Sequence, residues 1–243
     1  MKRRTFIKNG AISIAGLSLV PISAFQQSIA DDLLMGRKMP KLFGKEHRLL
    51  KEAHFSFEKM KAAAKKEGIH IKTVSSYRSY DHQNLIWQRK YKKYSATGMT
   101  PLQCLKKIIE YSTIPGTSRH HWGTDLDIVD TNTPQPQNLL LEKHFHGTGP
   151  FCKLREWMEQ HAATYNFHLV YTQDKQRKGF KYEPWHYSYA PLSIPFLKSF
   201  EDIDLQQELE KTSLLGNEYL TEDFINQYVT NNVMDINPAL LDF

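Results

Sequence analysis

Three short polar segments hold most of the side chains that could do chemistry in this chain. They are residues 75–80 (SSYRSY), 118–127 (SRHHWGTDLD) and 183–186 (EPWH). Catalytic zinc takes three protein ligands from histidine, aspartate or glutamate and leaves one position open for water or substrate. The residue types in these segments therefore indicate a metal-dependent hydrolytic site.

The ligand types fit best at three positions. His120 lies just before an expected strand, Asp127 lies on that strand, and His186 lies on a neighbouring one. Gly123 allows the tight backbone bend that would let His120 and Asp127 converge. Glu183 is close enough to His186 to act as a general base without being a ligand. We therefore expect one zinc ion on two imidazoles and a carboxylate.

Attack of water on a peptide carbonyl leaves an oxyanion that needs a positive partner. Arg78 follows another expected strand, and its guanidinium stays charged and grips an oxyanion or a carboxylate with two hydrogen bonds. We expect Arg78 to stabilise this charge or to position the substrate.

The order of these motifs resembles the VanY-like D-alanyl-D-alanine carboxypeptidases, zinc peptidases of the LAS group. The pattern S-x-H-x-x-G-x-x-x-D covers residues 118–127, E-x-W-H covers residues 183–186, and Y-R-S-x-x-x-Q covers residues 77–83. The resemblance extends from about residue 40 to residue 192. It implies zinc on the three ligands above, with Glu183 as base and later as acid.

The resemblance also implies that Ser118, Gln83 and Tyr77 contact the substrate, which would be a peptidoglycan stem peptide. Asp125 departs from the pattern, because the family often has alanine there. Asp125 and Asp127 point to the same face of a strand. Asp125 is thus either a carboxylate that orients a histidine ligand or, alternatively, a ligand in place of Asp127.

The elements that must position these residues alternate between helices and short strands. Helical spacing is expected at 47–66, 81–94 (capped by Asp81), 100–111 and 151–165, and strands at 69–74, 124–129, 167–171 and 182–189. Few, short strands favour an α+β fold with a small, mainly antiparallel sheet that carries the zinc site and is flanked by helices.

Residues 1–30 have the pattern of an export signal peptide. Four basic residues and no acid lead into a modestly apolar run, and small residues at 28 and 30 suit a signal peptidase. The sequence RRTFIK resembles the twin-arginine consensus. We expect export by this route, most simply to the periplasm, with no stable membrane span after cleavage.

Charge divides the remainder into a domain at 31–200 and a tail at 201–243. The domain has 27 basic and 16 acidic residues, whereas the tail has ten acids and one base, Lys211. We expect the tail to form short helices that pack on the domain and offset its charge. A basic domain suits anionic envelope polymers, and no nucleic-acid motif is present.

Several alternatives remain at this point. The stem peptide could be trimmed by a DD-carboxypeptidase or an LD-carboxypeptidase. The alternative is a peptidoglycan endopeptidase of the same fold or a non-catalytic, zinc-stabilised cell-wall-binding module. An arginine near zinc favours capture of a free carboxylate and hence a carboxypeptidase. The sequence leaves open the oligomeric state and whether Cys104 and Cys152 are bridged.

Overall fold

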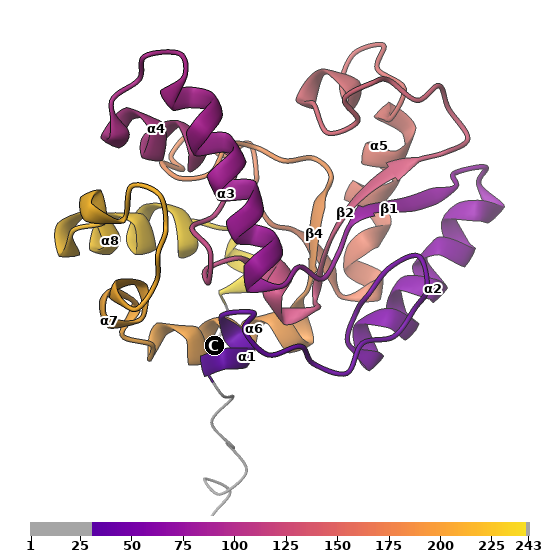
Figure 1. Cartoon of the computed structure of the whole chain (residues 1–243). Coiled ribbons are helices and arrows are strands. Elements are labelled where there is room, and N and C mark those ends of the chain that lie inside the picture. Colours follow the sequence, from indigo (N-terminus) through magenta and orange to yellow (C-terminus); the bar gives the residue numbers. More distant parts are fainter. Residues whose placement is uncertain (1–30, 242–243) are drawn as a thin grey trace, which may run out of the picture.

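The computed structural model describes residues 31–241 (Figure 1). The expected signal peptide at 1–30 lies outside the described residues, as do the last two residues of the chain. Within residues 31–241 no helix is both long enough and apolar enough to cross a membrane.

Helices and short strands alternate along the chain. The α-helices are α1 (Asp31–Leu34), α2 (Lys51–Lys66), α3 (Tyr80–Ser95), α4 (Pro101–Ile108), α5 (Cys152–His161), α6 (Ala190–Glu201), α7 (Leu205–Glu210) and α8 (Glu222–Tyr228). The strands are β1 (Ile71–Ser75), β2 (Asp125–Asp130), β3 (Phe167–Leu169) and β4 (His186–Tyr189). Short 3-10 turns include η2 (Arg119–Trp122) and η4 (Ala162–Tyr165), and a π-helical turn, Val229–Val233, extends α8.

The four strands form one antiparallel sheet in the order β1-β2-β4-β3. This confirms the α+β fold with a small antiparallel sheet. Strand β2 is buried at every position rather than alternating between buried and exposed residues. Its two edges pair with β1 and β4, and the burial of every residue shows that both of its faces are covered as well.

Local sequence determines where the helices begin and end. Helix α2 ends before Gly68, whose φ of 78° suits glycine. Helix α4 begins with a capping box between Thr100 and Gln103. The expected cap of α3 at Asp81 is wrong: the side chain of Ser79 accepts the hydrogen bond from the His82 amide, because the helix begins one residue earlier, at Tyr80.

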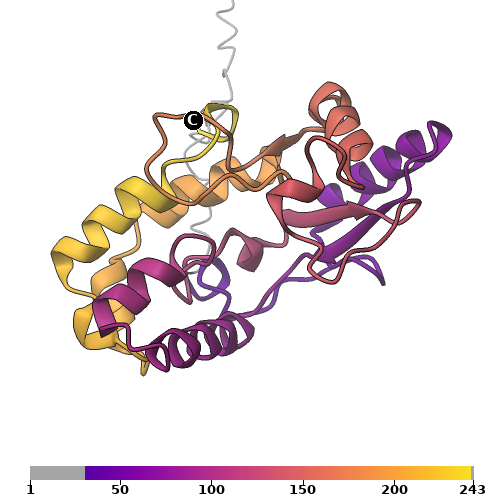
Figure 2. The same cartoon turned by 90° about the horizontal axis from the view of Figure 1, so that it is seen from above.

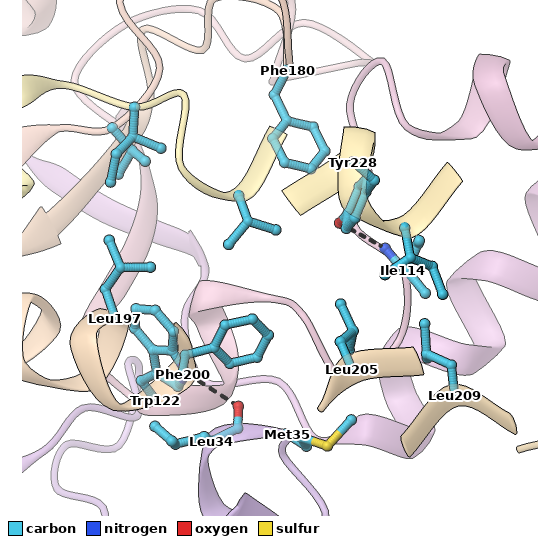
Figure 3. Packing of buried hydrophobic residues seen from close by; sticks show 14 of the residues in the cluster. Leu34, Met35, Ile114, Trp122, Phe180, Leu197, Phe200, Leu205, Leu209 and Tyr228 are labelled. Carbon is cyan, nitrogen blue, oxygen red and sulfur yellow. Dashed lines mark hydrogen bonds between the residues drawn. The ribbon is translucent and has the colours of Figure 1, made fainter. Parts of the chain in front are cut away.

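Two hydrophobic clusters hold the molecule together. One packs α2 and α5 against the sheet, with residues such as Phe57, Leu126 and Phe167 fully buried. The other joins the N-terminal helix α1, the helices α3 and α4, and the C-terminal helices (Figure 3). In its centre Trp122 donates a hydrogen bond to the carbonyl of Leu34.

The acidic tail packs as short helices against the rest of the molecule. Figure 2 shows the C-terminal helices beside α3 and α4, with the sheet, α2 and α5 on the other side. Trp87 of α3 donates to the carbonyl of Leu215, and the hydroxyl of Tyr228 lies 2.7 Å from Thr117 Oγ1. Helix α6 has no counterpart among the expected elements, since Pro191 and Pro195 obscure its helical pattern.

The two cysteines do not form a disulfide. Cys104 is buried on α4, Cys152 begins α5, and both are free thiols.

Candidate active site

Strand register brings Asp127 and His186 together. These two residues are direct partners across the antiparallel pair β2 and β4, so their side chains stand beside one another on one face of the sheet. Nδ1 of His186 lies 3.9 Å from Oδ1 of Asp127. This spacing leaves room for a cation between them.

His120 approaches the same point from η2. Its Nε2 lies 3.5 Å from Oδ2 of Asp127, and its ring stacks on that of His186 at 4.7 Å. Gly123 ends η2 with a φ of 69°, and a side chain there would meet Leu42, so glycine permits the turn from His120 into β2. The three sequence-predicted ligands therefore converge.

Hydrogen bonds orient both imidazole rings toward Asp127. Nδ1 of His120 donates to the carbonyl of Ser76 at 2.8 Å, which leaves Nε2 with its lone pair facing the cleft. Nε2 of His186 lies 3.1 Å from Oδ2 of Asp125, and Nδ1, the nitrogen nearer Asp127, lies 3.0 Å from Oε2 of Glu183. Nδ1 is therefore the nitrogen that would release its proton to bind a metal. Asp125 thus contacts His186 at Nε2, the nitrogen that does not face Asp127, and is not part of the converging triad.

These residues fit a zinc ion. One ligand atom each from His120, Asp127 and His186 lie within 4.8 Å of one another, and all three residues are buried. Oδ1 of Asp127 is buried without a hydrogen-bond partner among the described residues. Two imidazoles and a carboxylate are a ligand set of catalytic zinc sites.

The pKa values show how tightly these groups are crowded. Burial raises the pKa of Asp127 to about 7, and Glu183 adds to this rise. Burial lowers the pKa of His186, but hydrogen bonds to Asp125 and Glu183 outweigh it and raise the pKa to about 10. Burial, together with the nearby Arg78, holds the pKa of His120 well below its usual value. A cation would compensate the buried carboxylates without requiring protons.

Asp125 belongs to a buried polar network behind the triad. Its carboxylate accepts hydrogen bonds from Nε of Arg119 at 3.0 Å and from the hydroxyls of Thr124 and Ser188, both at 2.7 Å. Arg119 also donates to Ser188. Burial raises the pKa of Asp125, but Arg119 and His186 outweigh burial and hold it well below its usual range. This carboxylate is therefore charged at neutral pH.

Glu183 and Arg78 both lie close to the triad. Oε2 of Glu183 is 3.0 Å from Nδ1 of His186, the nitrogen that would bind a metal. Arg78 donates one hydrogen bond to Gln83 and another to Ser75 Oγ. Burial lowers the pKa of Arg78, while Asp127 and Glu183 oppose this effect. Both side chains line the cleft.

The cleft has a volume of about 460 Å³ and lies over the triad. Ser118 lines it together with the triad, Glu183 and Arg78. Leu140, Phe180 and Trp185 form apolar parts of its wall, and Arg89 and Lys90 of α3 add positive charge. The cleft therefore combines an apolar wall with positive charge.

Two residues expected to contact substrate do not line this cleft. Gln83 is fully buried on α3, where it accepts from Arg78 and donates to the carbonyl of Thr113. Tyr77 borders a different hollow, where Arg48 lies over its ring. The geometry gives Gln83 the role of orienting Arg78. The sequence does not indicate this role, because it depends on the packing of α3 against residue 113.

His121 also stabilises the site, although its side chain does not line the cleft. It is fully buried; its Nε2 accepts a hydrogen bond from the amide of Gly116, so Nδ1 donates to the carbonyl of Arg78 at 2.6 Å. His121 thereby ties the loop before η2 to the segment that carries Arg78.

The fold and the site together define a family of peptidases. The sequence model of VanY, D-alanyl-D-alanine carboxypeptidase, matches residues 46–192, and the chain belongs to this family. A putative carboxypeptidase, YodJ, of Bacillus subtilis is 30% identical over 162 residues, which are 66% of this chain and 53% of that protein. The chain thus spans about half the length of this relative. A D-alanyl-D-alanine carboxypeptidase of Enterococcus faecalis is 29% identical over 129 residues, 53% of this chain and 43% of that protein.

Solved structures show the same fold. The vancomycin-resistance D,D-pentapeptidase VanY, determined in complex with Zn(II), is 22% identical with a TM-score of 0.51, over 76% of this chain and 90% of that chain. The LD-carboxypeptidase LdcB is 26% identical with a TM-score of 0.51, over 74% of this chain and 82% of that chain. The LdcB structure reveals the molecular basis of peptidoglycan recognition by that protein.

Proposed function

We propose that this chain is an exported zinc metallocarboxypeptidase that removes the C-terminal D-alanine from peptidoglycan stem peptides. The observation that carries the proposal is the convergence of His120, Asp127 and His186 in one cleft, with Glu183 3.0 Å from Nδ1 of His186. Membership of the VanY family and the names of the relatives support the substrate class.

One zinc ion held by His120, Asp127 and His186 would supply the Lewis acidity that makes water a nucleophile at neutral pH. Glu183 is placed to take a proton from that water and later to give it to the leaving amine. Its carboxylate is 3.0 Å from His186 Nδ1, which puts it next to the ligands without being one of the converging triad.

Arg78 is placed to bind the free carboxylate of the substrate or the oxyanion of the reacting carbonyl. Its two hydrogen bonds to Gln83 and Ser75 hold the guanidinium at the cleft. The buried groups of the centre are the carboxylates of Asp125, Asp127 and Glu183 and the guanidiniums of Arg78 and Arg119. These three carboxylates and two guanidiniums have a net charge of −1. A bound dication would change this to +1, which a substrate carboxylate would balance.

Ser118 lies at the cleft wall and remains our candidate for a direct substrate contact. Arg89 and Lys90 add positive charge at the side of the cleft formed by α3, which suits acidic stem peptides. Export, by the twin-arginine route and to the periplasm, is proposed from the N-terminal sequence alone.

The test is mass spectrometry of defined tetrapeptide and pentapeptide muropeptides incubated with the purified full chain, with and without a chelator. Loss of one alanine that stops with chelator and returns with zinc is the expected result. Cleavage of the pentapeptide would make the protein a DD-carboxypeptidase, and cleavage of the tetrapeptide an LD-carboxypeptidase. Cleavage within the stem would replace the proposal with an endopeptidase. Zinc binding without any cleavage would replace it with a cell-wall-binding module.

A further inference from the structure

A second group of potential metal ligands lies at the beginning of α2. His54 and Glu58 are on this helix, and His47 is in the segment that precedes it. One ligand atom from each of these three side chains lie within 4.8 Å of one another. We propose that His47, His54 and Glu58 form a second site for a divalent transition metal, with zinc as its natural probe.

The separations between these atoms are close to those of a zinc site. Nε2 of His47 lies 2.8 Å from Nδ1 of His54 and 3.5 Å from Oε1 of Glu58. Tetrahedral zinc, with bonds of about 2.0–2.2 Å to nitrogen and oxygen, places neighbouring ligand atoms about 3.3–3.6 Å apart. A small rotation of the half-buried His54 ring widens the shorter distance into this range.

Secondary structure places two of the ligands on one helix face, and packing holds the third. Residues four apart on a helix share one face, so α2 presents His54 and Glu58 together. His47 is only 4% exposed, and its ring packs edge-on against Phe57 of the same helix at 4.8 Å. Ligands that are already held in place lose little conformational entropy when they bind.

The protonation states also suit a metal. Burial lowers the pKa of His47 to about 4, so its ring is neutral at pH 7 and carries a lone pair. Nδ1 of His47 is buried without a partner among the described residues, whereas its Nε2 shares a hydrogen bond with Nδ1 of His54 that a metal would replace. A metal on Nε2 would fix that choice.

Lys61 is the group that competes with a metal for Glu58. Its ammonium lies 3.5 Å from Oε1 of Glu58 and 4.0 Å from Oε2 of Glu46. Lys61 therefore has a second carboxylate to pair with when Glu58 turns toward a metal. This competition implies an affinity below that of the cleft site.

The location gives this second site a structural role. Arg48, next to His47, donates its amide to Ser76 Oγ at 2.9 Å, and its carbonyl accepts from the amide of Tyr77. The carbonyl of Ser76 in turn accepts from Nδ1 of His120. A metal on His47 would join the segment of His47 and Arg48 to α2. This segment hydrogen-bonds Ser76, which in turn holds the cleft ligand His120.

The test is the zinc content of the purified full chain after dialysis against buffered zinc, measured by elemental mass spectrometry. We expect two zinc ions per wild-type chain and one in His54→Ala, whose half-buried side chain can be removed without opening the core. Glu58→Gln should bind the second zinc at least tenfold more weakly in a competition titration. His70→Ala is the matched control: His70 is exposed and belongs to neither group, so this variant should keep both ions.

Three results would overturn this second site. One is a wild-type chain with a single zinc that His120→Ala removes and His54→Ala does not. Another is a folded His54→Ala variant that retains two ions, and a third is loss of the second ion in His70→Ala as well. By contrast, a single zinc that disappears in His54→Ala but not in His120→Ala would support this site and count against the cleft site. The two proposals therefore fail separately.

Discussion

Asp125 of β2 and His186 of β4 are diagonal neighbours on paired strands, with Oδ2 of Asp125 3.1 Å from Nε2 of His186. Because this carboxylate is charged, it acts as an acceptor and keeps the proton of the imidazole on Nε2. A metal beside Asp127 would then bind Nδ1 in place of the proton that this nitrogen shares with Glu183.

Replacing Asp125 should weaken metal binding. In Asp125→Asn we expect the affinity for zinc to fall by about 10–100-fold, the usual effect of losing a carboxylate behind a histidine ligand. A competition titration with a coloured chelator measures this, with circular dichroism to show that the variant is folded. Undiminished affinity would remove Asp125 from this role.

A double variant separates orientation from charge. Asp125→Asn leaves the buried Arg119 without its ion-pair partner, and breaking a buried pair costs about 3–5 kcal/mol of stability. Arg119→Met combined with Asp125→Asn removes the unpaired charge. If the affinity loss persists in the double variant, the orienting hydrogen bond is its cause. If the double variant instead regains the wild-type zinc affinity, the unpaired charge of Arg119 is the cause of the loss.

Glu183 should be needed for the reaction but not for zinc. We expect Glu183→Gln to retain one zinc in the cleft and to lose about 10²–10⁴-fold in kcat, the usual contribution of a general acid–base group. Glu142→Gln is the matched control, because Glu142 lines the same cleft outside the triad. Turnover of Glu183→Gln at the wild-type rate would disprove the assignment. His120→Ala should instead lose the cleft zinc.

Gln83 should act through Arg78. Gln83→Leu keeps the approximate volume but removes the acceptor for Arg78 and the donor to Thr113. A hydrogen bond to a charged group contributes about 1.5–3 kcal/mol, so we expect kcat/KM to fall by about 10–100-fold with zinc content unchanged. Gln88→Leu, a half-buried change on the same helix, should leave kcat/KM as it is. Equal values for wild type and Gln83→Leu would contradict this role.

Tyr228 should stabilise the loop before η2. Its hydroxyl accepts from the amide of Ile114 and bonds to Thr117, and all of these groups are buried. Tyr228→Phe leaves a buried donor unpaired, which costs about 1–3 kcal/mol. For a chain of this size each 1 kcal/mol lowers Tm by about 2–4 °C. Thermal unfolding measures the shift, and Tyr219→Phe, an exposed tyrosine, should show none.

The sequence was most informative where chemistry and strand geometry coincide. His120, Asp127 and His186 were predictable because residue type restricts metal ligands and because Gly123 marks the turn between the first two. The end of α2 at Gly68 and the beginning of α4 at Thr100 were predictable from local rules of capping.

Relations between distant segments were not predictable. The role of Gln83 depends on how α3 packs against residue 113, and nothing in residues 77–83 shows that this side chain is turned inward. Helix α6 was missed because Pro191 and Pro195 obscure it, although proline is tolerated at the beginning of a helix. The contact between Tyr228 and Thr117 joins residues 111 positions apart, which no local pattern indicates.

This last contact has a consequence for a chain emerging from the ribosome. The loop that leads to His120 is synthesised long before Tyr228. The hydrophobic cluster that contains Trp122 is also incomplete until Leu205 and Leu209 have been added (Figure 3). It needs Ile225 as well. Nascent chains that end before residue 228 therefore lack the support of this loop. The cleft can therefore complete its folding only after the acidic tail has been synthesised.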